Sequence, residues 1–154
     1  MSLILAVEPD RRQAAQLTGI IRHYVGAELI LADTTEGALG AIGRRVPDLV
    51  LVPSANDMHQ DHGVLYWEAL RAFKKEASIW GYEHPWNNLT FTTDIFVRLR
   101  PEHLEKKIRA LKEYKSQTDR GYMDERNIRS LVATRGAQLD IQYAEAFELI
   151  RLLY

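Results

Sequence analysis

Apolar residues follow two different spacings along the chain. Short runs of consecutive apolar residues alternate with longer stretches in which apolar residues recur every three or four positions. The first pattern is typical of strands buried on both faces, and the second is typical of amphipathic helices. The runs predict five strands, at residues 3–7, 28–32, 49–52, 78–83 and 95–99. The helical spacing predicts helices at about residues 10–25, 34–44, 65–73, 101–117, 124–136 and 143–153.

Strands that alternate with helices over short connections are typical of parallel sheets with right-handed crossovers. We therefore expect an α/β fold: a three-layer αβα sandwich around a mostly parallel sheet of about five strands, of the Rossmann or flavodoxin-like kind. The length matches one ordinary domain, so we expect a single domain over residues 1–154. In such sheets, ligands bind beyond the carboxyl ends of the strands.

Charge and composition exclude several classes of function. Twenty basic residues against twenty-one acidic ones leave a net charge of −1, so the basic surface of a nucleic-acid-binding protein is absent. The chain has no cysteine, which excludes disulfides and thiol catalysis. Its first residues, MSLILAVEPD, lack a basic region, and their apolar run is too short for a signal peptide or a membrane span. We expect a soluble cytoplasmic protein.

Two polar loops follow predicted strands, and the second of them, residues 56–62, contains His59-x-x-His62. Residues three apart at the start of a helix share a face, so both imidazoles could point at one ion. Imidazole suits zinc, and Asp57 or Asp61 could be a ligand, a group that orients a histidine, or a base. A solvated loop with capping aspartates would show the same pattern.

The other polar loop carries Glu8 and Asp10 at the end of the first predicted strand. Carboxylates two apart can hold Mg²⁺ or supply a general base. Equally, Asp10 could interact only with the dipole of the following helix, and Glu8 could be solvated. His23, His84 and His103 have no metal-like neighbours in the sequence, and we interpret them as surface or packing residues.

The composition changes near residue 53. Residues 1–53 contain no lysine and one aromatic residue, whereas residues 54–154 hold all six lysines and the other thirteen aromatics. No linker rich in Gly, Ser or Pro marks the change. The break reflects either chance within one small protein or two stretches of different ancestry joined inside a continuous fold.

From about residue 47 to its end, the chain strongly resembles the carboxyl-terminal part of the PIG-L/LmbE-like zinc-dependent N-deacetylases. The matching stretches are PDLVLVPSANDMHQDH, GYEHPWNN, LEKKIRALKEYKSQ and ATRGAQ…YAEAFELIR. The resemblance implies a Rossmann-like sheet and removal of acetyl groups from N-acetylated amino sugars. It also implies that His62 is a zinc ligand and that His59 stabilises the tetrahedral oxyanion or assists proton transfer.

The same family carries a His-Pro-Asp-Asp-Glu motif after its first strand, where this chain reads EPDRR. The resemblance places Asp10 at the position of the general base, Glu8 at that of a zinc histidine and Arg11 at that of a zinc aspartate. Zinc chemistry of this kind needs three protein ligands, so the departure implies weak or absent zinc, with Glu8 and Asp57 as substitute ligands.

Residues 1–53 instead resemble the first βαβαβ segment of a response-regulator receiver domain, through ILAVEPD and PDLVLV. The phospho-acceptor aspartate of that family would fall on Pro53, so phosphorylation there is not expected. We interpret the chain as a chimera, engineered or natural, with a receiver-like segment at 1–53 and a deacetylase-like segment at 54–154.

Three functional hypotheses follow. The leading one is a folded chimera without competent catalysis that binds a divalent metal weakly at a remnant deacetylase site, and that covers apolar surface at the join by forming a homodimer. The alternative is a zinc-dependent N-deacetylase of N-acetyl amino sugars, with Asp10 as base, His59 at the oxyanion, and His62 with Glu8 or Asp57 as metal ligands. The third is a degenerate receiver-like binding module.

Overall fold

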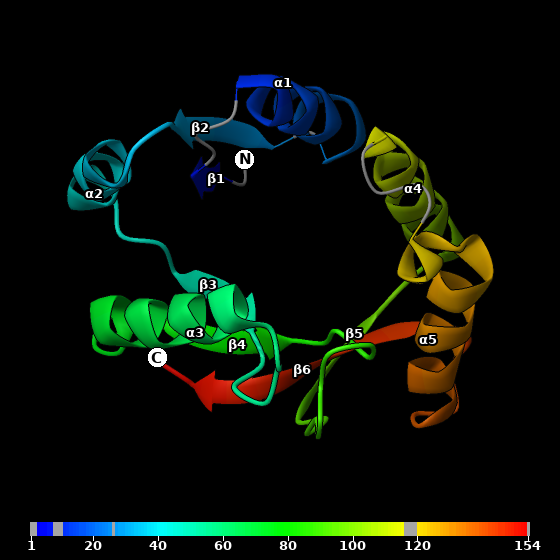
Figure 1. Ribbon diagram of the computed structural model, residues 1–154. Helices are drawn as coiled ribbons and strands as arrows, with labels where there is room; N and C mark the ends of the chain where they lie inside the picture. Colours follow the sequence, from blue (N-terminus) through cyan, green and yellow to red (C-terminus); the bar gives the residue numbers. More distant parts are fainter. Residues whose placement is uncertain (1–2, 8–10, 26, 116–119, 154) are drawn as a thin grey trace. The chain divides into compact units, whose positions relative to one another are not determined.

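The computed structural model describes residues 3–7, 11–25, 27–115 and 120–153 (Figure 1). Its strands are β1 (Leu3–Val7), β2 (Glu28–Ala32), β3 (Leu49–Pro53), β4 (Ser78–Tyr82), β5 (Ile95–Arg98) and β6 (Ala144–Arg151). Its helices are α1 (Arg11–Ile20), continued by the π-helical turn η1 (Ile21–Val25), α2 (Thr35–Arg44), α3 (Gln60–Phe73), α4 (Pro101–Lys112), the 3₁₀ turn η3 (Gly121–Met123) and α5 (Glu125–Ala137). Within the described residues, no helix combines the length and the hydropathy that a bilayer span needs.

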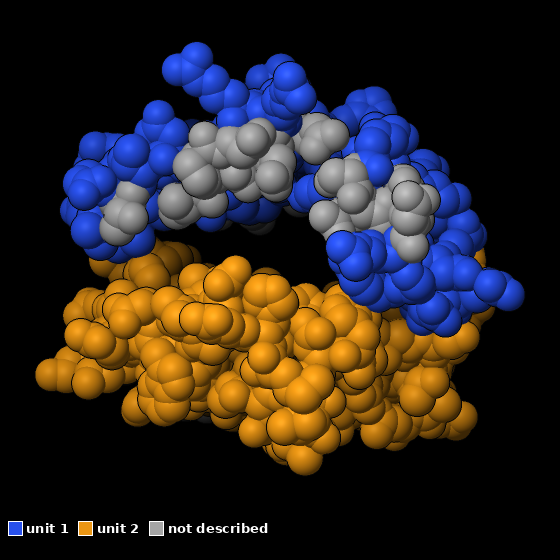
Figure 2. Space-filling model, viewed as in Figure 1, with its two compact units in different colours: residues 1–45, 101–128 blue, residues 46–100, 129–154 orange. Residues whose placement is uncertain are grey.

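The chain divides into two compact units, which Figure 2 shows in different colours. Unit 1 comprises Met1–Arg45 and Pro101–Ile128, and unit 2 comprises Val46–Arg100 and Arg129–Tyr154. In unit 1, β1 and β2 pair in parallel, α2 packs against both strands, and α4 contacts η1. The organisation as a single domain with segments 1–53 and 54–154 stays a prediction.

Unit 2 contains a mixed sheet of four strands in the order β3-β4-β6-β5. β3 and β4 are parallel, whereas β6 is antiparallel to both of its neighbours, β4 and β5. β1 and β2 form a separate two-stranded parallel sheet. The expectation of a mostly parallel five-stranded sheet of the Rossmann or flavodoxin-like kind is therefore wrong, although all five predicted strands are present.

The main cause of this error is β6, which the spacing of apolar residues predicts as a helix. Its sequence, AEAFELIR, is rich in residues with high helix propensity. In the structure it alternates between buried and more exposed positions, with Ala144, Ala146 and Glu148 buried, as expected of a strand. Because β6 lies between β4 and β5, it forms ladders on both of its edges, and this pairing overrides the local preference of the chain.

The core of unit 2 lies between α3 and the sheet (Figure 1). Val52 of β3, Ala69 of α3 and Ile79 of β4 are buried there. Partly buried side chains from α3 and the sheet pack around them: Val50, Tyr66, Leu70, Phe73 and Ile150. This packing fixes α3 across the parallel pair β3–β4, so the first turn of α3 stays close to the carboxyl ends of these strands.

The connection from α5 to β6 depends on Gly136 near the end of α5. The N–H groups of Leu139 and Ile141 both donate to the carbonyl of Gly136, each at 3.0 Å. Asp140 has a φ of 53°, in the left-handed region. A Cβ atom on Gly136 would lie 2.6 Å from the carbonyl oxygen of Ile141 and 2.7 Å from that of Gln142. The chain therefore returns over this residue at a distance that only glycine allows.

We predict that Gly136→Ala destabilises the protein by more than about 2 kcal/mol, because backbone atoms have to move to accept the methyl group. Gly19→Ala is the matched control, since a Cβ atom there meets nothing within 4 Å. That control should change the free energy of unfolding by at most about 1 kcal/mol, in the stabilising direction. Urea unfolding of both variants measures the two effects, and equal stability of Gly136→Ala and the wild type would contradict the prediction.

Asp124 caps the start of α5. Its Oδ1 accepts the backbone N–H of Arg126 at 2.8 Å, and its Oδ2 lies 2.6 Å from a guanidinium nitrogen of Arg126. The hydrogen bonds from the side chain and the backbone of Arg126 lower the pKa of Asp124 from 3.8 to about 2. The folded state therefore favours the ionised carboxylate.

This lowered pKa predicts a pH dependence of stability with a definite sign. Asp124 contributes stability above its ordinary pKa of 3.8, and the contribution is lost as the pH falls towards about 2. Asp124→Asn keeps a side chain that can cap α5 but does not ionise. We expect the wild type to be more stable than Asp124→Asn at pH 6, and the difference to shrink at pH 3, when both are unfolded with urea. A difference that does not change with pH would contradict the assignment.

Candidate metal centre

The candidate site lies where β3 and β4 end. These strands are parallel neighbours with Pro53 opposite Tyr82, so the loops that follow them leave the same edge of the sheet. Two backbone hydrogen bonds join the loops, from Met58 N–H to the carbonyl of Asn87 and from Leu89 N–H to the carbonyl of Asn56, each at 3.1 Å. The two loops therefore form one connected structure.

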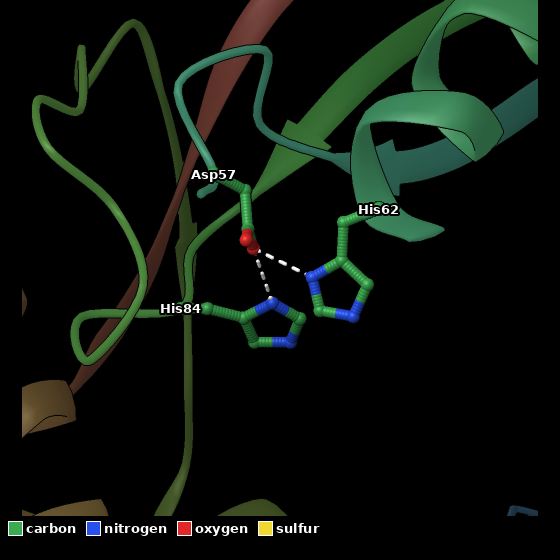
Figure 3. A group of neighbouring side chains, drawn as sticks. All are labelled: Asp57, His62 and His84. Atoms are coloured by element: carbon green, nitrogen blue, oxygen red, sulfur yellow. Dashed lines mark hydrogen bonds and ion pairs between the residues drawn. The ribbon is translucent and has the colours of Figure 1, made fainter. Parts of the chain in front are cut away.

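Asp57 occupies the centre of the site and has no exposed side-chain surface. Its Oδ1 accepts the backbone N–H of His59 at 2.8 Å. Its Oδ2 is hydrogen-bonded to Nδ1 of His62 at 2.7 Å and to Nδ1 of His84 at 3.0 Å (Figure 3). Both carboxylate oxygens are thus engaged by groups of the protein.

The surroundings of Asp57 keep it ionised. Burial by itself raises the pKa of this carboxyl group, but the hydrogen bonds from the His59 backbone and from the His62 and His84 rings outweigh burial, so the pKa of Asp57 is lowered. Asp57 in turn acts on Tyr82, whose pKa is raised by burial and by the nearby negative charge. The site therefore contains a buried negative charge beside a neutral phenol.

His59 and His62 enter the site from the start of α3. His59 caps the helix, and its Nδ1 accepts the backbone N–H of Asp61 at 3.2 Å. The rings of His59 and His62 are stacked with their centroids 4.5 Å apart. Asp61 lies in the first turn of α3, where a negative charge interacts favourably with the helix dipole. The histidine pair is thus held by helix geometry.

His84 enters the site from the loop after β4. Its backbone N–H donates to Oδ1 of Asn88 at 2.6 Å, and its carbonyl accepts the N–H groups of Asn87 and Asn88 at 2.8 and 2.9 Å. Its ring centroid lies 4.8 Å from that of His62 and 5.1 Å from that of Trp86. A tight turn and ring contacts on several sides therefore fix the position of His84.

An ion pair anchors the segment next to His84. The guanidinium of Arg135, on α5, is bonded through Nε and a terminal nitrogen to the two carboxylate oxygens of Glu83. Both side chains are largely buried, with 16% and 10% exposed. Arg135 also lies over the ring of Phe91, 5.7 Å from its centroid. The loop from Glu83 to Phe91 is therefore attached to α5 as well as to the loop that carries Asp57.

Asp57, His62 and His84 form a group that could hold a metal ion. Their possible ligand atoms, one from each residue, all lie within 4.8 Å of one another. Two imidazoles and a carboxylate are the donor types that zinc takes in catalytic sites. The chemistry of these side chains therefore fits a zinc ion.

The structure brings together part of the site that the sequence predicts. Asp57 and His62 are in contact, and His59 is stacked on His62. Glu8 and Asp10 lie outside the described residues, so their expected roles stay predictions. Sequence reasoning did not include His84 in the site, whereas the structure places it in contact with Asp57 and His62. The signal that could have identified it is its place directly after a strand that runs parallel to β3.

Comparison with known proteins indicates that the chain has a deacetylase-like fold. No family model matches the chain. The uncharacterised deacetylase YaiS of Escherichia coli (strain K12) is 37% identical over 60 residues, which are 39% of this chain. The match spans 32% of the length of that relative, about one third.

Three solved structures share the fold of nearly the whole chain. The conserved protein TT1542 from Thermus thermophilus has a TM-score of 0.73 at 18% identity, over 99% of this chain and 83% of that one. The zinc-inhibited form of teicoplanin deacetylase Orf2 has a TM-score of 0.69 at 13% identity, over 94% and 85%. A deacetylase triple mutant (Orf2*T) of the teicoplanin biosynthetic pathway has a TM-score of 0.68 at 16% identity, over 94% and 83%.

These likenesses replace the expected flavodoxin-like architecture with a fold like that of the solved deacetylases. The structural match to TT1542 covers 99% of the chain, so it includes residues on both sides of the composition break at residue 53. The expected chimera with a receiver domain finds no support in these comparisons.

Proposed function

We propose that the protein is a zinc-dependent hydrolase that removes acetyl groups from N-acetylated amino sugars, as deacetylases of the PIG-L/LmbE type do. The observation that carries this proposal is the buried Asp57 carboxylate with the His62 and His84 rings bonded to it at the carboxyl ends of β3 and β4. Together with the deacetylase-like fold, this cluster supports the hydrolase better than the chimera without competent catalysis that the sequence analysis favoured.

The metal ion would bind at the cluster of Asp57, His62 and His84. When bound, zinc supplies a Lewis acid that polarises the amide carbonyl of the substrate and activates water. The rings of His62 and His84 are 27% and 21% exposed at their side chains, so a ligand can reach them from solvent. The site thus combines metal-binding side chains that are held in place with histidine rings that a substrate can reach.

His59 is suited to a different task from that of the other two histidines. Its Nδ1 accepts a backbone N–H, so a neutral His59 ring carries its proton on Nε2. This N–H can donate to the oxyanion that forms when water adds to the amide carbonyl. The stacked His59 and His62 rings hold this donor next to the cluster.

Asp10 as general base and Glu8 as a further ligand complete the proposal as predictions from the sequence. A base beside the metal would take a proton from the attacking water and later protonate the amine that leaves.

The proposal predicts that zinc content and acetate release depend on His62. We expect the purified wild type to bind about one zinc ion per chain and to release acetate from N-acetylglucosamine-type compounds. His62→Ala should lose both properties, and His23→Ala, in the other unit, should keep both. Metal analysis and an acetate assay measure these outcomes. Equal zinc in the wild type and His62→Ala, or no acetate from the zinc-loaded wild type, would overturn the proposal.

A second prediction separates His59 from the metal ligands. His59→Ala should keep the zinc content of the wild type and should lower kcat by about 10²–10³-fold, the effect of removing one donor to an oxyanion. The measurement is kcat for acetate release, combined with metal analysis of the same preparation. Loss of zinc in this variant would show that His59 acts as a ligand instead.

A further inference from the structure

The hydrogen bonds around Asp57 fix which nitrogen of each histidine is free. An ionised carboxylate only accepts hydrogen bonds, so both Nδ1 atoms that contact Oδ2 must carry a proton. A neutral imidazole has one ring proton, so in the neutral form of each ring Nε2 keeps its lone pair. Figure 3 shows the second nitrogen of His62 and of His84 on the side away from Asp57.

Asp57 itself is poorly placed to bind a cation. Its side chain is fully buried, whereas those of His62 and His84 are partly exposed. Its Oδ1 is occupied by the backbone N–H of His59, and its Oδ2 by two ring nitrogens. A cation at Oδ2 would have to displace both ring hydrogen bonds and enter the buried space between the rings.

We infer that Asp57 is a positioning residue rather than a ligand, and that it presents Nε2 of His62 and Nε2 of His84 to one metal ion. This inference rests on the proposed function for the identity of the metal. It makes His84 a ligand and removes Asp57 from the ligand set that the sequence predicts. Carboxylates that receive the second N–H of a metal-binding histidine fix the tautomer of the ring and strengthen its basicity.

The rest of the site supports this role for His84. Asn88 receives the backbone N–H of His84, and the rings of Tyr82 and Trp86 lie 5.0 and 5.1 Å from the His84 ring, centroid to centroid. The ion pair between Glu83 and Arg135 holds the preceding residue. The His84 ring is therefore held in place before any ion binds.

The first experiment determines the tautomers in the metal-free full chain by ¹⁵N NMR of the histidine rings, at a pH where the rings are neutral. We expect the proton on Nδ1 in both His62 and His84, and on Nε2 in His59, which serves as an internal reference. Asp57→Asn should change the tautomer of His62, of His84 or of both. A wild-type His62 or His84 with its proton on Nε2 would overturn the inference.

The second experiment measures zinc affinity by competition with a chromophoric chelator. Asp57→Asn should still bind zinc, about 10–100-fold more weakly than the wild type. This is the loss expected when a carboxylate that orients metal-binding histidines is removed. His62→Ala and His84→Ala should lose binding, and His23→Ala should match the wild type. If His84→Ala binds like the wild type while Asp57→Asn does not bind, then Asp57 is the ligand and the inference is wrong.

The two experiments distinguish failure of this inference from failure of the proposed function. If Asp57→Asn does not fold, the tautomers of the wild type still test the positioning role, because they need no variant. A wild type that binds no zinc overturns the ligand role of His84 together with the proposed function. Zinc binding by the wild type without acetate release overturns the proposed activity and leaves the ligand assignment standing.

Discussion

A carboxylate that is buried without partners would destabilise the protein by several kcal/mol, and this constraint organises the loops of unit 2. Asp57 has no exposed side-chain surface, so the protein must supply its hydrogen bonds from within. It does so with one backbone N–H at the start of α3, the His62 imidazole from the first turn of α3 and the His84 imidazole from the loop after β4. The same three bonds that stabilise the charge also bring together a helix cap, a strand end and two histidines, so folding and assembly of the site depend on one group.

Local patterns in the sequence were sufficient to locate β1 to β5 and part of the site. The short apolar run Leu49–Val52, which lies between two prolines, predicts a strand from local sequence. His59 and His62 are close because a helix begins between them. β6 and His84 could not be predicted in this way. β6 is a strand only because two distant strands pair with it, and His84 reaches Asp57 only because β3 and β4 are parallel neighbours. Both depend on pairing between segments that are far apart in the sequence, which hydrophobic periodicity does not report.

Ionic groups also hold the sheet and the loops of unit 2 together. The ion pair between Glu83 and Arg135 joins α5 to the loop that carries His84. Glu148, buried on β6, accepts the backbone N–H of Thr92 and lies over Gly81, where a Cβ atom would approach its Oε2 to 2.9 Å. Such groups add little net stability compared with apolar packing, but an alternative packing would leave them without partners. They therefore favour a single arrangement of the residues around the site.

The position of β6 in the sheet has a consequence for biosynthesis. β4 and β5 leave the ribosome before β6, yet they pair through β6 and not with each other. Until β6 has left the ribosome, each of the two strands has an unpaired edge facing the place that β6 will occupy. Free strand edges are templates for intermolecular association. Nascent chains of this protein are therefore most vulnerable to aggregation in the interval between synthesis of β5 and insertion of β6, a period in which a chaperone would be most useful.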